Sequence, residues 1–137
     1  MGEQVVPDKT EIFAPKAFNT ILYCRQWERT VAFYRDKLRL SITFANDWFV
    51  EFKVTGNGYL SIANVERTSL NRNYKGDNSG LTLTFQVDDA DQTWLMLRES
   101  GLTLGPVKTH PWGARLFYFH DPEGHRLEIW SLLKDTQ

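Results

Sequence analysis

Residues 112–130 read WGARLFYFHDPEGHRLEIW and predict two β-strands joined by a tight turn. The turn is the segment 121–124, Asp-Pro-Glu-Gly, in which each residue type has a local reason to be there. Proline presets φ at the second position, glycine admits a positive φ, and aspartate bonds to the backbone ahead of it. The chain therefore ends in a β-hairpin.

The turn decides which side chains share a face of this hairpin. If His120 pairs with His125, then Leu127 and Ile129 point to one face, which we expect to be the core. Glu128 points to the other face, as a lone carboxylate among apolar neighbours, and it is the leading candidate for a functional residue. The set predicted on that face is Arg115, Phe117, Glu128 and Trp130.

Two halves of the chain repeat one order of elements. The first half predicts a strand at 17–24, a helix at 27–37, and strands at 41–46, 48–55 and 58–64. The second half predicts a strand at 81–87, a helix from 90 to 101, and strands at 105–109, 114–120 and 125–132. This repeat predicts an α+β fold of two βαβββ modules whose curled mixed sheets form a shared cleft lined by eight strands.

The predicted division of the chain follows from this repeat. An N-terminal arm takes residues 1–16, the first module 17–64, a linker 65–79, the second module 80–133 and a tail 134–137.

Composition limits the class of partner. A net charge of −1 excludes broad electrostatic capture of nucleic acid or of an anionic membrane. No apolar run reaches the roughly 20 residues that span a bilayer, and the first residues lack a signal-peptide core. The single cysteine, Cys24, excludes an intramolecular disulfide. We expect a cytoplasmic protein that binds neither nucleic acid nor membrane.

Four segments resemble the vicinal oxygen chelate superfamily, which includes glyoxalase I, bleomycin-resistance proteins, fosfomycin-resistance enzymes and extradiol dioxygenases. NTILYCRQ at 19–26 and TVAFY at 30–34 look like the opening of its first module. FQVDD at 85–89 and FHDPEGHRLE at 119–128 look like the start and end of its second module. The resemblance runs from residue 17 to 132 and implies a fold more than a reaction.

The resemblance also implies where a metal would be bound. Catalytic members present a histidine on the first strand of each module and a carboxylate on the last strand. The histidine positions fall on Asn19 and Thr82, the carboxylate falls on Glu128, and the repeat places Ser61 at the matching position of the first module. Only Glu128 is a good ligand for zinc, iron or nickel. We expect no cofactor and no divalent metal.

Aromatic side chains on or beside the strands predict a largely apolar pocket between the modules. A few polar groups would orient a ligand there, and the aromatic rings would supply contact area. The leading hypothesis is a protein that binds an aromatic or amphipathic small molecule, and resembling proteins are often homodimers. The candidate ligand-binding residues are Asn19, Tyr23, Trp48, Thr82, Trp112, Arg115, Phe117 and Trp130.

Two other interpretations of the chain stay open. In an enzyme, Glu128 is the candidate catalytic residue, acting as acid or base in a lyase, isomerase or dioxygenase, or as ligand of a weakly held metal. In an interaction module, large inward residues such as Tyr23, Phe117 and Trp130 fill the cleft. Glu128 also has a purely structural interpretation, as a strand residue paired with Arg115 or Arg126.

The cysteine and the histidines have structural interpretations as well. Cys24 lies on the apolar face of its predicted strand, which indicates a buried and inert thiol. His120 and His125 flank the turn at its expected exposed end, and both are predicted to point away from Glu128. We therefore expect no metal role for them or for His110.

Overall fold

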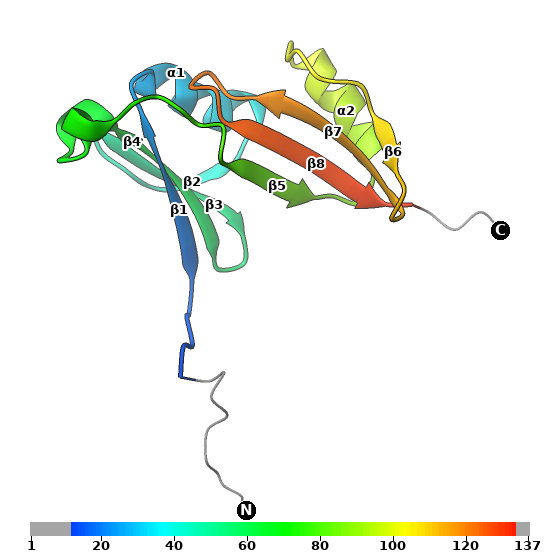
Figure 1. The fold of residues 1–137 in the computed structure, drawn as a ribbon, viewed down its shortest axis with the longest axis horizontal. Helices are drawn as coiled ribbons and strands as arrows, with labels where there is room; N and C mark the ends of the chain where they lie inside the picture. Colours follow the sequence, from blue (N-terminus) through cyan, green and yellow to red (C-terminus); the bar gives the residue numbers. More distant parts are fainter. Residues whose placement is uncertain (1–11, 134–137) are drawn as a thin grey trace, which may run out of the picture.

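The computed structural model describes residues 12–133, so the predicted tail and most of the predicted arm lie outside the described residues. The chain forms two four-stranded mixed sheets, one per module, which confirms the predicted α+β architecture. Figure 1 shows the two sheets side by side, with both helices toward one end of the molecule.

The first sheet has the strand order β1-β4-β3-β2, in which β1 and β4 are parallel and the other neighbours are antiparallel. A helical segment consisting of α1 and a π-helical turn follows β1. The bounds are β1 Phe18–Cys24, α1 Trp27–Ala32, the π-helical turn Phe33–Lys37, β2 Ser41–Ala45, β3 Phe49–Thr55 and β4 Gly58–Asn64.

The second sheet repeats this topology as β5-β8-β7-β6, with β5 and β8 parallel. Its bounds are β5 Thr82–Gln86, α2 Ala90–Glu99, β6 Lys108–His110, β7 Ala114–His120 and β8 Arg126–Leu132. Asp89 caps α2 by accepting a hydrogen bond from the backbone N–H of Gln92 at 3.0 Å. Gly101, with φ of +92°, follows the end of the helix, where a left-handed residue is common.

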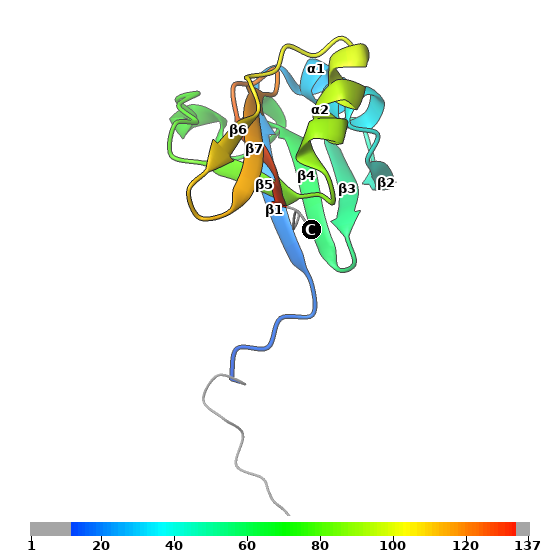
Figure 2. The same ribbon diagram turned by 90° about the vertical axis from the view of Figure 1, so that its right-hand side faces the viewer.

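One hydrophobic core joins the two modules. Side chains from both sheets and from the α1 segment belong to the same buried cluster. Phe33, which follows α1, packs on Phe119 of β7 with ring centroids 6.1 Å apart. The first helical segment therefore lies between its own sheet and the second module, and both views of the ribbon agree with this placement (Figures 1 and 2).

The hairpin register differs by one residue from the prediction. His120 pairs with Arg126, not with His125, so the loop comprises the five residues 121–125. The backbone N–H of Asp121 donates to the His125 carbonyl at 3.0 Å and closes the loop. Tyr118 consequently lies opposite Glu128. A shift of one residue moves every side chain of β7 to the other face of the sheet.

Two predicted placements are therefore wrong. Phe117 lies opposite Ile129 and is fully buried in the core. Arg115 lies opposite Ser131, on the helix side of the sheet, where its guanidinium donates to the Asp91 carboxylate of α2 at 2.6 Å. The expected core positions of Leu127 and Ile129 are confirmed.

The residues between the modules fold back against the second module's turn. Two short 3-10 turns, Val65–Arg67 and Asn71–Asn73, lie within this linker. No helix in the described part of the chain is long and apolar enough to cross a membrane.

Candidate functional site

Glu128 lies on the face of the second sheet that points away from α2. Thr84 is its register partner on β5, and the Thr84 hydroxyl donates a hydrogen bond to the Glu128 carboxylate. Tyr118 is its partner on β7, and hydrogen bonding to Glu128, with partial burial, raises the pKa of the Tyr118 phenol. The carboxylate is thus held between two hydroxyl groups, one on each neighbouring strand.

Arg126 is the next side chain along this face, and it binds groups other than Glu128. Its Nε donates to the Thr82 hydroxyl at 2.9 Å, and its guanidinium lies 4.5 Å from the centre of the Tyr118 ring. Within residues 12–133 no lysine or arginine forms an ion pair with Glu128. The interpretation of Glu128 as a strand residue paired with Arg115 or Arg126 is therefore wrong for the described residues. We call this surface the module-2 face; it comprises Thr82, Thr84, Tyr118, Arg126, Glu128 and Trp130.

Two tryptophans continue the module-2 face. Trp130, two residues beyond Glu128 on β8, packs edge-on against Trp112 with ring centroids 5.4 Å apart. Trp112 precedes β7 and is 57% exposed, so a large aromatic surface meets solvent beside the carboxylate. Exposed aromatic area next to a few polar and charged groups is typical of a small-molecule binding surface.

The corresponding surface of the first sheet carries the other predicted polar residue. The Ser61 hydroxyl donates to the Asn19 side-chain carbonyl at 3.0 Å, and the Asn19 amide donates to Glu51 at 3.5 Å. Tyr23 lies farther along the same strand and is half-buried. We call this surface the module-1 face; it comprises Asn19, Tyr23, Glu51 and Ser61.

The structure gathers the predicted site residues into separate groups. Asn19 and Tyr23 lie on the module-1 face, whereas Thr82, Glu128 and Trp130 lie on the module-2 face. No hydrogen bond or ion pair between these two faces occurs in the described part of the chain. The remaining candidate, Trp48, packs on Phe49 at the turn between β2 and β3.

A pocket of about 460 Å³ lies between the two modules. Phe18 and Thr20 of β1 line one side, and Leu83, Thr84 and Phe85 of β5 line the other. Thr84 therefore both contacts Glu128 and borders this pocket. Side chains of both sheets therefore line one pocket at the junction of the modules.

The donors at the predicted metal positions do not fit a transition metal. The Thr82 hydroxyl accepts a hydrogen bond from the Arg126 guanidinium, and the positive charge of Arg126 repels a cation at that position. The Asn19 side-chain carbonyl accepts a hydrogen bond from the Ser61 hydroxyl. Neutral hydroxyl and amide oxygens are weak ligands for zinc, iron or nickel. Within residues 12–133 no cluster of three or more His, Cys, Asp or Glu side chains is arranged to hold an ion.

Cys24 and the histidines lie in different environments. Cys24 is fully buried, and burial raises the pKa of its thiol well above the ordinary value, as expected for an inert thiol. His120 is exposed and pairs in register with Arg126, so it shares the face of Glu128, contrary to the prediction. His125 is buried, with 2% of its surface exposed, so its predicted exposed position is also wrong.

Two site residues were missed in the sequence, and strand alternation could have found one of them. Tyr118 and Thr84 are the hydroxyl partners of Glu128. Had the turn been assigned five residues, strand alternation would have placed Tyr118 opposite Glu128. The parallel register of β5 and β8 places Thr84 opposite Glu128, and no local sequence signal determines that register.

Comparisons with known proteins agree with this fold. The glyoxalase-like domain family matches residues 18–134. The uncharacterized protein YraH of Bacillus subtilis (strain 168) is 28% identical over 122 residues, which are 82% of this chain and 94% of that protein.

Two solved structures share the fold at low sequence identity. A lactoylglutathione lyase from Agrobacterium tumefaciens aligns with a TM-score of 0.68 at 22% identity, over 87% of this chain and 96% of that one. TnmS3, an antibiotic binding protein from Streptomyces sp. CB03234, aligns with a TM-score of 0.69 at 18% identity, over 86% and 96%. The fold thus occurs in both an enzyme and a binding protein.

Proposed function

Because this chain belongs to the glyoxalase-like domain family, we propose that it binds an aromatic or amphipathic small molecule between its modules, without a divalent metal. One observation carries the proposal. The module-2 face combines a carboxylate, Glu128, that two hydroxyls hold in place with a pair of tryptophans, of which Trp112 is exposed and Trp130 is half-buried. Fixed polar groups beside aromatic area orient and bind a ligand.

Each group has a distinct role in this proposal. Glu128 pairs with a cationic or hydrogen-bond-donating group of the ligand, because Thr84 and Tyr118 hold its carboxylate and no lysine or arginine in residues 12–133 forms an ion pair with it. Trp112 and Trp130 contact the apolar part of the ligand. The antibiotic binding by TnmS3 supports a binding role on this fold.

The absence of a metal is proposed on the donor chemistry. Thr82 and Asn19 stand where catalytic members of the resembling superfamily have imidazoles. Both side chains already form hydrogen bonds within the protein. These two residues instead orient the ligand through hydrogen bonds. Arg115 and Phe117 are left out of the proposed site, because both lie on the helix side of the second sheet.

The proposal includes a homodimer in the cytoplasm. Several large apolar side chains of the first sheet are exposed, including Phe18 at 70% and Phe44 at 53%. A second copy of the chain that covers such side chains gains hydrophobic stabilisation and encloses the ligand. Light scattering on the purified chain measures the oligomeric state directly.

A matched pair of probes tests the binding proposal. Tryptamine and indole-3-propionate share an indole ring but carry opposite charges, and calorimetry measures the affinity of each. We expect the cation to bind more tightly, and we expect Glu128→Gln to remove the preference because the charge is lost while the shape is kept. Glu66→Gln is the matched control, since Glu66 is an exposed glutamate outside both faces. Equal affinity for both probes in the wild type contradicts the assigned role of Glu128.

An enzymatic role for the same face is the alternative, and one contact favours it. Glu128 and Tyr118 form a carboxylate–phenol pair in which either group is able to move a proton. Turnover of dicarbonyl–thiol adducts, catechols and epoxides, with and without added metal, tests this alternative. A Glu128→Gln variant that keeps full turnover rules out an acid–base role for Glu128.

A further inference from the structure

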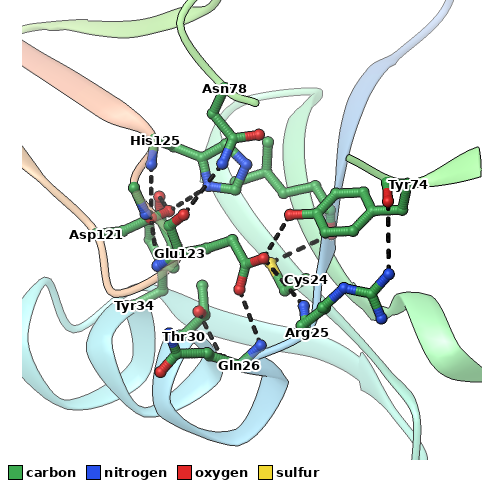
Figure 3. Close-up of polar contacts among 12 residues, drawn as sticks. Cys24, Arg25, Gln26, Thr30, Tyr34, Tyr74, Asn78, Asp121, Glu123 and His125 are labelled. Atoms are coloured by element: carbon green, nitrogen blue, oxygen red, sulfur yellow. Dashed lines mark hydrogen bonds and ion pairs between the residues drawn. The ribbon is translucent and has the colours of Figure 1, made fainter. Parts of the chain in front are cut away.

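The loop between β7 and β8 is bound to the linker and to the start of α1. The Glu123 carboxylate accepts hydrogen bonds from the backbone N–H of Arg25 at 3.0 Å and of Gln26 at 2.8 Å, and from the Tyr74 hydroxyl. The Asn78 amide donates to the Glu123 carbonyl at 3.0 Å. Figure 3 shows these contacts around the loop. The linker is therefore held in a defined position over the loop.

Asp121, at the start of this loop, accepts five hydrogen bonds. Its Oδ1 accepts from the backbone N–H groups of Glu123, Gly124 and His125 at 2.9–3.0 Å. Its Oδ2 accepts from the Tyr34 hydroxyl at 2.7 Å and contacts His125 Nδ1 at 2.8 Å (Figure 3). A carboxylate saturated by donors requires a proton on His125 Nδ1.

The second ring nitrogen of His125 has no such partner. In the part of the chain that the structure describes, no protein group forms a hydrogen bond with His125 Nε2. The side chain is only 3% exposed. In the tautomer that carries its proton on Nδ1, Nε2 is an acceptor. Buried acceptors are nearly always hydrogen-bonded, so this nitrogen needs an explanation.

His125 lines a pocket of about 500 Å³ between β1 and the linker. We call it the linker pocket, and its apolar, aromatic and imidazole lining consists of Ile21, Leu22, Tyr23, Leu70, Tyr74, Leu81 and His125. Polar side chains of the linker, from Asn73, Lys75, Asp77 and Asn78, also line the pocket beside these aliphatic and aromatic walls. Neither Glu128 nor Trp130 belongs to its lining, so it is separate from the module-2 face.

We propose that the linker pocket is a second ligand site, which takes a small phenol whose hydroxyl donates to His125 Nε2. Apolar walls beside a buried acceptor suit an apolar molecule that carries one donor. The two tyrosine rings, Tyr23 and Tyr74, favour an aromatic ligand over an aliphatic alcohol. Arg25 stacks on the Tyr74 ring at 5.2 Å and holds that wall of the pocket. This site does not depend on the ligand proposed for the module-2 face.

The direct test is nitrogen-15 NMR of the histidine side chains in the full chain, with p-cresol as the probe. The matched control ligand is p-xylene, in which a methyl group replaces the hydroxyl. We expect p-cresol to shift the His125 Nε2 resonance and to bind about tenfold more tightly than p-xylene, because only p-cresol donates to the acceptor. Equal affinity for the two compounds overturns the assigned hydrogen bond.

A pair of leucine variants locates the site. Leu81 is 38% exposed at the pocket wall, and Leu81→Trp fills the pocket without touching the contact between Asp121 and His125. The matched control is Leu95→Trp, since Leu95 is 48% exposed on α2 and lies outside the pocket lining. We expect only Leu81→Trp to abolish the p-cresol shift of His125.

Three outcomes contradict the proposal. The first is that p-cresol leaves the His125 resonances unchanged at saturating concentration. The second is that Leu81→Trp binds p-cresol as the wild type does. The third is that p-cresol shifts the indole N–H of Trp130 alone, which places the phenol on the module-2 face instead.

Discussion

The Asp121 carboxylate gives the sharpest prediction about stability. Its side chain is fully buried and its five donors come from the loop, from His125 and from Tyr34 in the first module. Asp121→Asn keeps the size of the side chain but removes the charge. The amide oxygen of the asparagine is able to accept the three hydrogen bonds from the backbone. Its NH2 group then faces the N–H group at His125 Nδ1, so two donors oppose each other.

The size of the effect follows from the bonds that change. A hydrogen bond to a charged group contributes about 1.5–3 kcal/mol, against about 0.5–1.5 for a neutral one, so three weakened backbone bonds cost about 3 kcal/mol. For a domain of this length, that loss lowers Tm by about 10 °C. Tyr34→Phe removes one donor from the same carboxylate, and we expect it to cost about 1–2 kcal/mol.

Urea unfolding of the purified variants measures these free energies. Asp36→Asn is the control, because Asp36 is an exposed aspartate that, among residues 12–133, forms an ion pair only with the adjacent Arg35, and we expect no measurable change there. An Asp121→Asn variant within about 1 kcal/mol of the wild type refutes the view that this carboxylate joins the two modules.

Three further predictions concern the core, the thiol and pH. Phe117→Ala should lower the free energy of unfolding in urea by about 3–5 kcal/mol, because the ring is fully buried. A loss below about 1 kcal/mol would indicate that Phe117 lies on the ligand face instead. Cys24 should react with Ellman's reagent only after denaturation, and stoichiometric reaction of the native protein contradicts its burial. The hydrogen bond from Arg115 lowers the pKa of Asp91, so this pair stabilises the fold above the ordinary carboxyl pKa of about 4 and loses that stability as pH falls through the lowered value. Asp91→Asn should therefore flatten the acid limb of a stability–pH profile, and an unchanged limb shows that the pair contributes nothing.

The fold was predictable because its signals are local and repeated. Alternating strands, two helical stripes and turn residues recur in the same order in both halves of the chain, and the sheets follow from that order. The capping role of Asp89 and the position of Gly101 after α2 also follow from residue type alone.

The arrangement of the site was less predictable, because it depends on a single residue in the loop. A four-residue turn and a five-residue loop both fit the segment that begins at Asp121, and only the side-chain bonds of Asp121 to three backbone N–H groups select the longer one. That choice sends Phe117 to the core and brings Tyr118 to Glu128.

Contacts between distant residues could not be predicted from the sequence. Tyr34 and Asp121 are 87 positions apart, and the sequence around neither residue indicates that the two form a hydrogen bond. The linker pocket depends on the same kind of contact, since Tyr74 reaches Glu123 across the loop. Such contacts follow from how the two modules pack together.

The most direct test of the central claim is calorimetric titration of the full chain with tryptamine, before and after dialysis against EDTA, with elemental analysis of both samples. The account predicts one Kd for the two samples and no stoichiometric metal in either. It also predicts a loss of about tenfold or more in the Glu128→Gln variant, which corresponds to about 1.4 kcal/mol. A tightly bound transition metal, or binding that disappears on dialysis and returns with a divalent ion, contradicts a metal-independent site built around Glu128.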